Sequence, residues 1–154
     1  MVRTGLNGIR LRLAHRLDLE AISNIEELSF PDPYPQKLLA NLLHENPKTF
    51  FVTEAQDGTI IGYCVAVEEL TRAHLISIAV LPQYRLQGIG KALIRALISS
   101  LDSRVTELRL EVKERNVEAM KLYESLGFRS EEFIEGYYGD GSAALEMRLK
   151  LDDR

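Results

Sequence analysis

The chain has 154 residues, of which 45% are hydrophobic and 27% charged, as in an ordinary globular protein large enough to bury a core without cross-links. Its formal net charge of -4 argues against a surface that binds nucleic acid. The sequence contains no run of 18 apolar residues, so no membrane span is predicted. The first ten residues, MVRTGLNGIR, lack the apolar core of a signal peptide. We therefore expect a cytoplasmic protein with a single domain over residues 1–154.

The cysteine and histidine content predicts neither a disulfide nor a metal site. Cys64 is the single cysteine and lies in the apolar run IIGYCVAV, so we expect it to be a buried packing residue in a reducing compartment. The three histidines, His15, His44 and His74, do not have the spacing of metal ligands. No metal is expected.

The first predicted elements are a strand and a helix. Hydrophobic residues alternate with arginines over 9–13, which predicts a half-buried strand. Asp18 is expected to cap a helix that ends before Pro31. The side chains expected on the buried face of this helix are Ala21, Ile22, Ile25 and Leu28.

A proline-rich loop, a second helix and a hairpin are predicted next. FPDPYP, residues 30–35, predicts the loop, and a short helix is expected from Gln36 to about Leu43. FFVTEA and TIIGYCVAVEEL predict two strands, joined by a turn at residues 56–58 that contains glycine.

The second half of the chain alternates strands with helices. HLISIAV predicts a strand, and from Gly88 the apolar spacing becomes helical, with Leu93, Leu97 and Leu101 on one face. LRLEV predicts another strand, and a helix over residues 117–126 should end at Gly127. FRSEEF and ALEMRLKL, on either side of EGYYGDGS, predict the last two strands. The order βααβββαβαββ predicts a mixed α/β fold, a sheet of about seven strands with about four helices on both faces.

Two glycines stand where a strand passes into a helix, in QYRLQGIGKAL. Glycine lets the backbone approach a ligand, and a helix N-terminus offers unpaired N–H groups to a phosphate. A Walker A loop is excluded because Arg85 stands where its first glycine would be and Ala92 follows the lysine. A dinucleotide motif would need glycine at Leu93. A tight turn without a ligand remains the structural alternative.

The pattern Arg85-x-x-Gly88-x-Gly90 resembles the acetyl-CoA pyrophosphate loop of the GNAT superfamily of N-acetyltransferases. A second block, LEVKERNVEAMKLYESLGF over residues 110–128, resembles the C-terminal signature of the same superfamily. The predicted order of elements also matches its fold. The resemblance extends over residues 9–149.

Two further segments resemble the protein N-terminal acetyltransferases, both the ribosomal-protein alanine type and the archaeal and eukaryotic Ard1 type. GYYGDGSAALEM, residues 136–147, is similar to their C-terminal ending, and FPDPYP is similar to the loop that covers the acceptor N-terminus. An ordinary connection between helices is the alternative for FPDPYP. Asp32 stands near a position where Ard1-type enzymes often have glutamate, which leaves the preferred acceptor residue open.

The resemblance implies a set of residues that bind acetyl-CoA. Backbone N–H groups of the strand before the loop would contact the pantetheine and polarise the acetyl carbonyl, and those of the loop would hold the pyrophosphate. An asparagine before the last helix would hydrogen-bond the pantetheine arm. These residues are Ile78, Ala79, Val80, Arg85, Leu86, Gln87, Gly88, Ile89, Gly90, Lys91 and Asn116.

The resemblance also implies the catalytic residues. Glu111 would be the general base, acting through water on the attacking amine, with a charged strand terminus as the alternative. Tyr123 would protonate the departing thiolate, with an aromatic on a buried helix face as the alternative. The amine would attack directly and form a tetrahedral intermediate. About one α-amine in ten is neutral at pH 7, against fewer than about one lysine in a thousand, so an N-terminal acceptor needs only a weak base.

Seven residues are expected to contact the acceptor. His74 coincides with a position that holds an aromatic residue or histidine near the substrate in some Ard1-like enzymes, although a surface histidine at a strand edge is the simpler interpretation. The others belong to FPDPYP and to the paired tyrosines. The seven are Phe30, Pro31, Asp32, Tyr34, His74, Tyr137 and Tyr138.

Three functions fit these observations. The first is acetyl transfer from acetyl-CoA to the N-terminal α-amine of proteins or peptides, with ribosomal proteins or nascent chains among the candidate partners. The second is a GNAT enzyme that acetylates a lysine side chain or a small-molecule amine. The third is a non-enzymatic acyl-CoA-binding module, which would not need both Glu111 and Tyr123. Neither nucleic acid nor a membrane is an expected partner.

Overall fold

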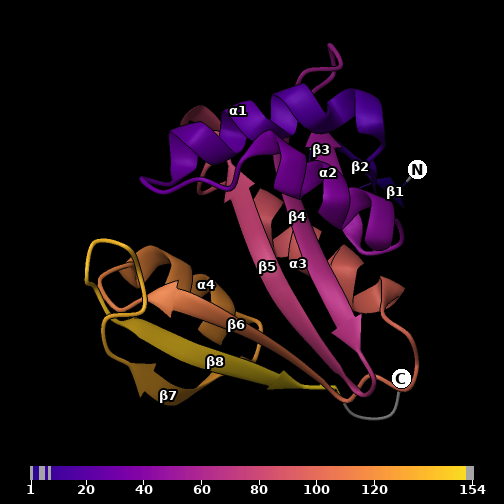
Figure 1. Ribbon diagram of the computed structural model, residues 1–154. Helices are drawn as coiled ribbons and strands as arrows, with labels where there is room; N and C mark the ends of the chain where they lie inside the picture. Colours follow the sequence, from indigo (N-terminus) through magenta and orange to yellow (C-terminus); the bar gives the residue numbers. More distant parts are fainter. Residues whose placement is uncertain (1, 4–5, 7, 152–154) are drawn as a thin grey trace. The chain divides into compact units, whose positions relative to one another are not determined.

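The computed structural model describes residues 2–3, 6 and 8–151. Its described helices and strands follow the predicted order, with one strand of two residues added at the start (Figure 1). Two short 3-10 helices, η1 (Arg16–Asp18) and η2 (Pro82–Tyr84), complete them. The strands and α-helices are β1 (Val2–Arg3), β2 (Arg10–Leu13), α1 (Leu19–Ser29), α2 (Gln36–Glu45), β3 (Phe50–Glu54), β4 (Ile60–Glu69), β5 (Arg72–Val80), α3 (Ile89–Ser100), β6 (Glu107–Lys113), α4 (Val117–Ser125), β7 (Arg129–Ile134) and β8 (Ala144–Lys150).

The hydrogen-bonded strand order is β1-β2-β3-β4-β5-β6-β8-β7. The pair β5–β6 is parallel, and the pairs β1–β2, β2–β3, β3–β4, β6–β8 and β7–β8 are antiparallel. The sheet is therefore mixed, and the α/β fold class expected from the sequence is confirmed. Among the described helices, none is long and apolar enough to cross a lipid bilayer.

The chain divides into two compact units. The first contains the described residues up to Val67 together with Ile76–Leu101, and the second contains Glu68–Leu75 and the described residues from Asp102 onward. Strand β5 contributes its first half to the second unit and its second half to the first. The assignment of residues 1–154 to one domain stays a prediction.

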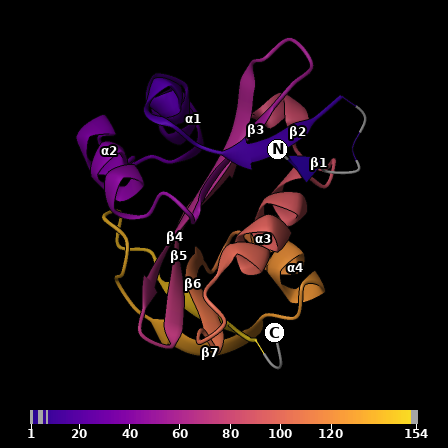
Figure 2. The ribbon, with the colours of Figure 1, turned by 90° about the vertical axis from the view of Figure 1, so that its right-hand side faces the viewer.

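In the first unit, helices cover both faces of the strands. Helices α1 and α2 lie on one side of β3 and β4, and α3 lies on the other (Figure 2). The α1–α2 side forms a core of buried side chains from helices and strands. Its largest members are Ile22, Ile25, Leu39, Phe50 and Tyr63. Cys64 faces α3, where its Sγ lies 3.7 Å from the carbonyl oxygen of Leu93, so its predicted packing role is confirmed.

In the second unit, α4 follows β6 and returns the chain to β7. The predicted end of this helix is confirmed, because Gly127 adopts a φ of +101° just after it. A Cβ at this glycine would lie 3.1 Å from the side chain of Leu149 on β8, so the backbone also approaches the sheet closely here. Strands β6 and β8 pair over their full lengths, from Glu107↔Lys150 to Lys113↔Ala144.

Two expectations about the first helix were wrong. The side chain of Asp18 does not cap α1; instead it accepts hydrogen bonds from both terminal nitrogens of Arg12, at 2.8 and 2.9 Å, and from the backbone N–H of His15. Burial alone would raise the pKa of Asp18, but these donors lower it below its ordinary value. Leu28 is 67% exposed and lies off the buried face.

Candidate functional site

The glycine loop of the first unit is built as a phosphate-binding turn would be. Leu86 and Gly88 both have positive φ, +62° and +84°, and Gly88 is the residue that precedes α3. The first intrahelical bond runs from the N–H of Ala92 to the carbonyl of Gly88, at 3.0 Å. Helical geometry therefore leaves the N–H groups of residues 89–91 without an intrahelical acceptor. These N–H groups and the helix dipole favour an anion.

Two cationic side chains belong to the same loop. Arg85 is folded back, and its Nε donates to the carbonyl oxygen of Val80 at 2.8 Å, which joins the loop to the end of β5. Lys91 lies in the first turn of α3. The residues present fit the pyrophosphate of acetyl-CoA, because the loop combines N–H donors, positive charge and a positive-φ glycine.

The other predicted ligand residues of the first unit lie on β5 and before α2. Ile78, Ala79 and Val80 form the end of β5. Phe30 packs against the core of the α1–α2 side. The residues Pro31, Asp32 and Tyr34 that follow it are exposed. The segment 30–34 is thus anchored at Phe30 and presents its next residues to solvent.

The second unit brings three of the predicted residues together around one carboxyl group. Nε2 of His74 lies 2.6 Å from Oε1 of Glu111, and the hydroxyl of Tyr137 donates to the same oxygen at 3.3 Å. The strand register explains the first contact, because His74 on β5 pairs with Arg109 on β6, two residues before Glu111. His74 is therefore no surface histidine at a strand edge, and that interpretation was wrong.

The pKa of Glu111 is lowered from its ordinary value of 4.5. Burial opposes this direction, but it is outweighed by the hydrogen bond from His74, the charge that this ring carries when protonated, the charge of Arg109 and the hydroxyl of Tyr137. Nη1 of Arg109 lies 3.6 Å from Oε2 of Glu111 and 3.9 Å from Oε2 of Glu146, the register partner of Glu111 on β8. Glu111 is therefore ionised at neutral pH and accepts hydrogen bonds.

The paired tyrosines, Tyr137 and Tyr138, lie between β7 and β8 and contact each other. Their rings meet edge to face with centroids 4.9 Å apart, and the ammonium of Lys113 lies 5.2 Å from the ring centre of Tyr138. Lys113 also pairs with Asp140 at 2.9 Å. The pKa of Asp140 is lowered, first by its hydrogen bonds from Ser142 and then by Lys113. These contacts hold the turn between β7 and β8.

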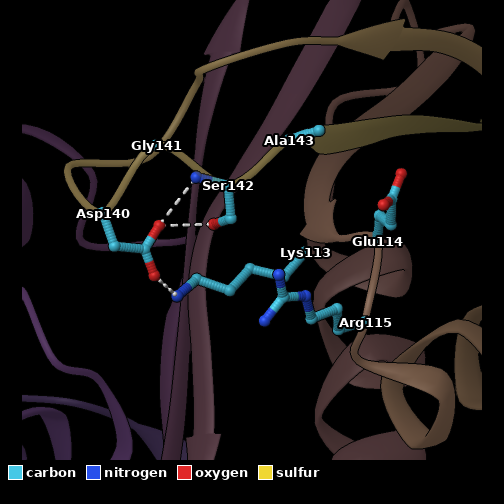
Figure 3. Close-up of a pocket in the computed structure, with 7 residues that line it drawn as sticks. All are labelled: Lys113, Glu114, Arg115, Asp140, Gly141, Ser142 and Ala143. Atoms are coloured by element: carbon cyan, nitrogen blue, oxygen red, sulfur yellow. Dashed lines mark hydrogen bonds and ion pairs between the residues drawn. The ribbon is translucent and has the colours of Figure 1, made fainter.

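A pocket of about 270 Å³ opens beside this turn (Figure 3). Figure 3 shows the guanidinium of Arg115 beside Lys113, with the carboxyl group of Glu114 pointing away from both. The wall opposite is formed by residues 140–143. No group of three or more His, Cys, Asp or Glu side chains in the described part of the chain is arranged to hold a metal ion.

Tyr123 and Asn116 belong to α4. Tyr123 is only 7% exposed, and its ring packs on Phe128 with centroids 5.7 Å apart. The side-chain oxygen of Asn116 accepts the N–H of Ala119 at 3.1 Å and caps the helix. Both residues have structural contacts, so their expected roles toward the donor stay predictions.

Sequence reasoning missed Arg109 and the pair Lys113–Asp140. A signal for Arg109 was present, because Glu107, Arg109, Glu111 and Lys113 alternate with the buried apolar residues of β6 and so share one face. Charges of opposite sign two residues apart on one face are near enough to interact. The partner of Lys113 was not predictable from spacing, because Asp140 comes from the turn 27 residues later.

Comparison with known proteins shows the family to which the chain belongs. Residues 19–128 match the acetyltransferase (GNAT) family model. The chain is 35% identical to an N-alpha-acetyltransferase of Sulfurisphaera tokodaii, over 92% of this chain and 93% of the relative. It is 38% identical to the ribosomal protein bS18-alanine N-acetyltransferase of Escherichia coli, over 79% and 81% of the two chains.

A solved structure gives the same result. Ard1 from Thermoplasma volcanium has a TM-score of 0.89 and 29% identity, and the match covers 95% of this chain and 99% of that one. Since the family model covers more than half of the chain and close relatives span most of it, this protein belongs to the GNAT family of acetyltransferases and is an enzyme.

Proposed function

We propose that this enzyme transfers the acetyl group of acetyl-CoA to the N-terminal α-amine of proteins or peptides. One observation carries the choice of acceptor: Tyr137, in the segment that resembles N-terminal acetyltransferases, donates a hydrogen bond to Glu111. Tyr137, which is expected to contact the acceptor, and the ionised carboxylate of Glu111 thus lie together in the second unit. The named activities of the relatives from S. tokodaii and E. coli support the same acceptor class.

The donor is proposed to bind along the first unit. N–H groups of residues 86–91 hold the pyrophosphate, with positive charge from Arg85 and Lys91. The backbone of residues 78–80 pairs with the pantetheine arm. When bound, acetyl-CoA supplies the activated acetyl thioester. In the second unit, the side-chain oxygen of Asn116 accepts the N–H of Ala119, which leaves its amide NH₂ as the hydrogen-bond donor of this side chain.

The contact between His74 and Glu111 changes which of the two residues we propose as the general base. A carboxylate with a lowered pKa is a poor base for an amine, whereas imidazole is well matched to neutral pH. With Glu111 ionised, Nε2 of His74 carries the hydrogen that it donates, and Nδ1 is left with its lone pair. We therefore propose that His74 accepts the proton of the amine, directly or through water, and that Glu111 orients the ring and stabilises its charged form.

Tyr123→Phe should lower kcat by about 10- to 10³-fold, because the variant removes the hydroxyl proposed to protonate the thiolate. The ring contact with Phe128 is retained in this variant. Steady-state kinetics measure the loss of turnover, and thermal denaturation checks that the variant is folded. Wild-type turnover in this variant would leave Tyr123 with a purely structural role.

Gly88→Val should weaken acetyl-CoA binding at least about tenfold, or about 1.4 kcal/mol, in calorimetric titration. A branched side chain at a φ of +84° would be strained and would cover the N–H groups that face the phosphate. Gly58→Val is the matched control, since Gly58 has a φ of +88° in the β3–β4 turn of the same unit. It introduces the same strain away from the loop and should leave the affinity unchanged. Equal affinities in both folded variants would refute the phosphate loop.

The proposed function is tested by acetyl transfer from labelled acetyl-CoA to peptides with free or blocked N-termini. A peptide with an N-terminal alanine is a suitable first acceptor, because the E. coli relative is a ribosomal protein bS18-alanine N-acetyltransferase. Transfer that needs the free α-amine supports the proposal. Transfer that is indifferent to blocking supports a lysine or small-amine acceptor.

A further inference from the structure

One buried carboxyl group has no part in the mechanism above. Glu26, on α1, is 2% exposed and accepts three hydrogen bonds within the first unit. Its Oε1 accepts from the hydroxyl groups of Tyr63 and Ser77, the latter at 3.1 Å. Its Oε2 accepts the backbone N–H of Tyr34 at 3.0 Å. Burying a carboxyl group costs free energy unless such partners are present, so each of the three hydrogen-bond donors stabilises Glu26 in this position.

The three donors come from different parts of the first unit. Tyr63 lies on β4 and Ser77 on β5, and their hydroxyl oxygens are 2.8 Å apart. Burial, and next to it the charge of Glu26, raises the pKa of Tyr63, so its phenol stays a hydrogen-bond donor at physiological pH. Ser77 directly precedes Ile78, the first residue of the proposed pantetheine-binding stretch. The sheet side of the network therefore consists of two buried hydroxyl groups on the adjacent strands β4 and β5.

The third donor belongs to the proline-rich segment. Of residues 31–35, three are prolines and lack an N–H, which leaves Asp32 and Tyr34 as the backbone donors. The bond from Tyr34 to Glu26 thus fixes the middle of a segment that has few other ways to attach its backbone. Tyr34 itself is 37% exposed, so the segment is anchored through its backbone and its side chain reaches solvent.

We propose that Glu26 is the positioning residue that holds segment 30–34 in the conformation that receives the acceptor. This inference rests on the proposed function, which assigns that segment to the acceptor. Glu26 touches neither substrate; it acts through the backbone of Tyr34. Its loss should therefore weaken acceptor binding and leave donor binding and the chemical step nearly unchanged.

Glu26→Gln is the test, because it keeps the size of the side chain and replaces one acceptor oxygen by a donor. The three donors around Glu26 then cannot all be accepted. The KM for the peptide should rise at least about tenfold, kcat should change by less than about threefold, and the calorimetric Kd for acetyl-CoA by less than about twofold. Amide hydrogen exchange at Tyr34 should become at least about tenfold faster. Ser77→Ala removes a donor but keeps the bond to Tyr34, so its peptide KM should stay within about threefold of wild type.

A second pair of variants covers the case in which Glu26→Gln does not fold. Tyr34→Ala keeps the backbone N–H, and Tyr34→Pro removes it while leaving Glu26, Tyr63 and Ser77 intact. The peptide KM should be at least about fivefold higher for Tyr34→Pro than for Tyr34→Ala. Equal KM values in this pair would overturn the inference. So would a folded Glu26→Gln variant whose peptide KM is unchanged, or one whose kcat and acetyl-CoA affinity fall together. If the wild-type enzyme acetylates lysine peptides instead, the proposed function fails, and the same KM comparison on a lysine peptide still decides the role of Glu26.

Discussion

Replacing Glu111 by glutamine should lower kcat for peptide acetylation by about 10²- to 10³-fold and leave acetyl-CoA affinity within about twofold of wild type. The variant removes the charge that orients His74 and stabilises its protonated form, at a contact of 2.6 Å. It removes no contact that is proposed to bind acetyl-CoA. Steady-state kinetics and calorimetry on the same preparation separate the two effects.

Glu107→Gln is the matched control for Glu111→Gln. Glu107 lies on the same face of β6 and is also part of an ion pair, at 3.5 Å from Arg148. Glu107 is four residues from Glu111 along the strand and pairs with Arg148 rather than with His74. The kcat of Glu107→Gln should therefore stay within about threefold of wild type. Equal losses in both variants would mean that the charge of the strand, rather than the contact with His74, supports turnover.

The pH dependence of turnover tests whether Glu111 is the titrating group, and a substitution tests the role of His74. The pKa of Glu111 lies below its ordinary 4.5, so its carboxylate loses its charge only when the pH falls below that value. An acidic limb of kcat/KM near neutral pH must therefore come from another group. We expect His74→Gln to lower kcat by about 10²-fold or more, because the variant removes the imidazole proposed to accept the proton of the amine. Wild-type turnover in His74→Gln would return the role of base to another residue.

Blocking the α-amine of an otherwise identical peptide should lower the transfer rate at least about 100-fold, even when the peptide contains lysine. At pH 7 about one α-amine in ten is neutral, against about one lysine in a few thousand, so the reactive fraction alone differs by more than about two orders of magnitude. One imidazole–carboxylate pair is a modest base and does not make up this difference. The rate is measured with labelled acetyl-CoA on the free and blocked peptides.

A third peptide serves as the control, with its internal lysine replaced by arginine and its N-terminus free. It should react as fast as the parent, because the lysine takes no part. Loss of transfer in this peptide, with transfer retained in the blocked one, would assign the enzyme to lysine acetylation.

The elements that local patterns define were predictable from the sequence. The change from period two to helical spacing at Gly88 located α3, and the glycine at 127 located the end of α4. The turn at residues 56–58 located the β3–β4 hairpin. Each of these signals acts over a few residues, so no distant contact was needed to interpret it.

The partners of the charged side chains were not predictable in the same way. The contact of His74 with Glu111 spans 37 positions and depends on the register of β5 against β6, which neither strand encodes alone. Asp18 has the composition of a helix cap, but Arg12 and the N–H of His15 bind its carboxylate instead. Contacts with residues before α1 override the preference for a cap here, because charge-assisted hydrogen bonds stabilise this buried carboxylate more than a cap would.

The most direct test of N-terminal acetylation is the position of the acetyl group on one peptide that carries both a free N-terminus and an internal lysine. Fragmentation mass spectrometry after limited turnover assigns that position. The account predicts acetyl on the N-terminal residue and unmodified lysine. Acetyl found chiefly on the lysine ε-amine, or turnover of polyamines or aminoglycosides with none on the peptide, would contradict it.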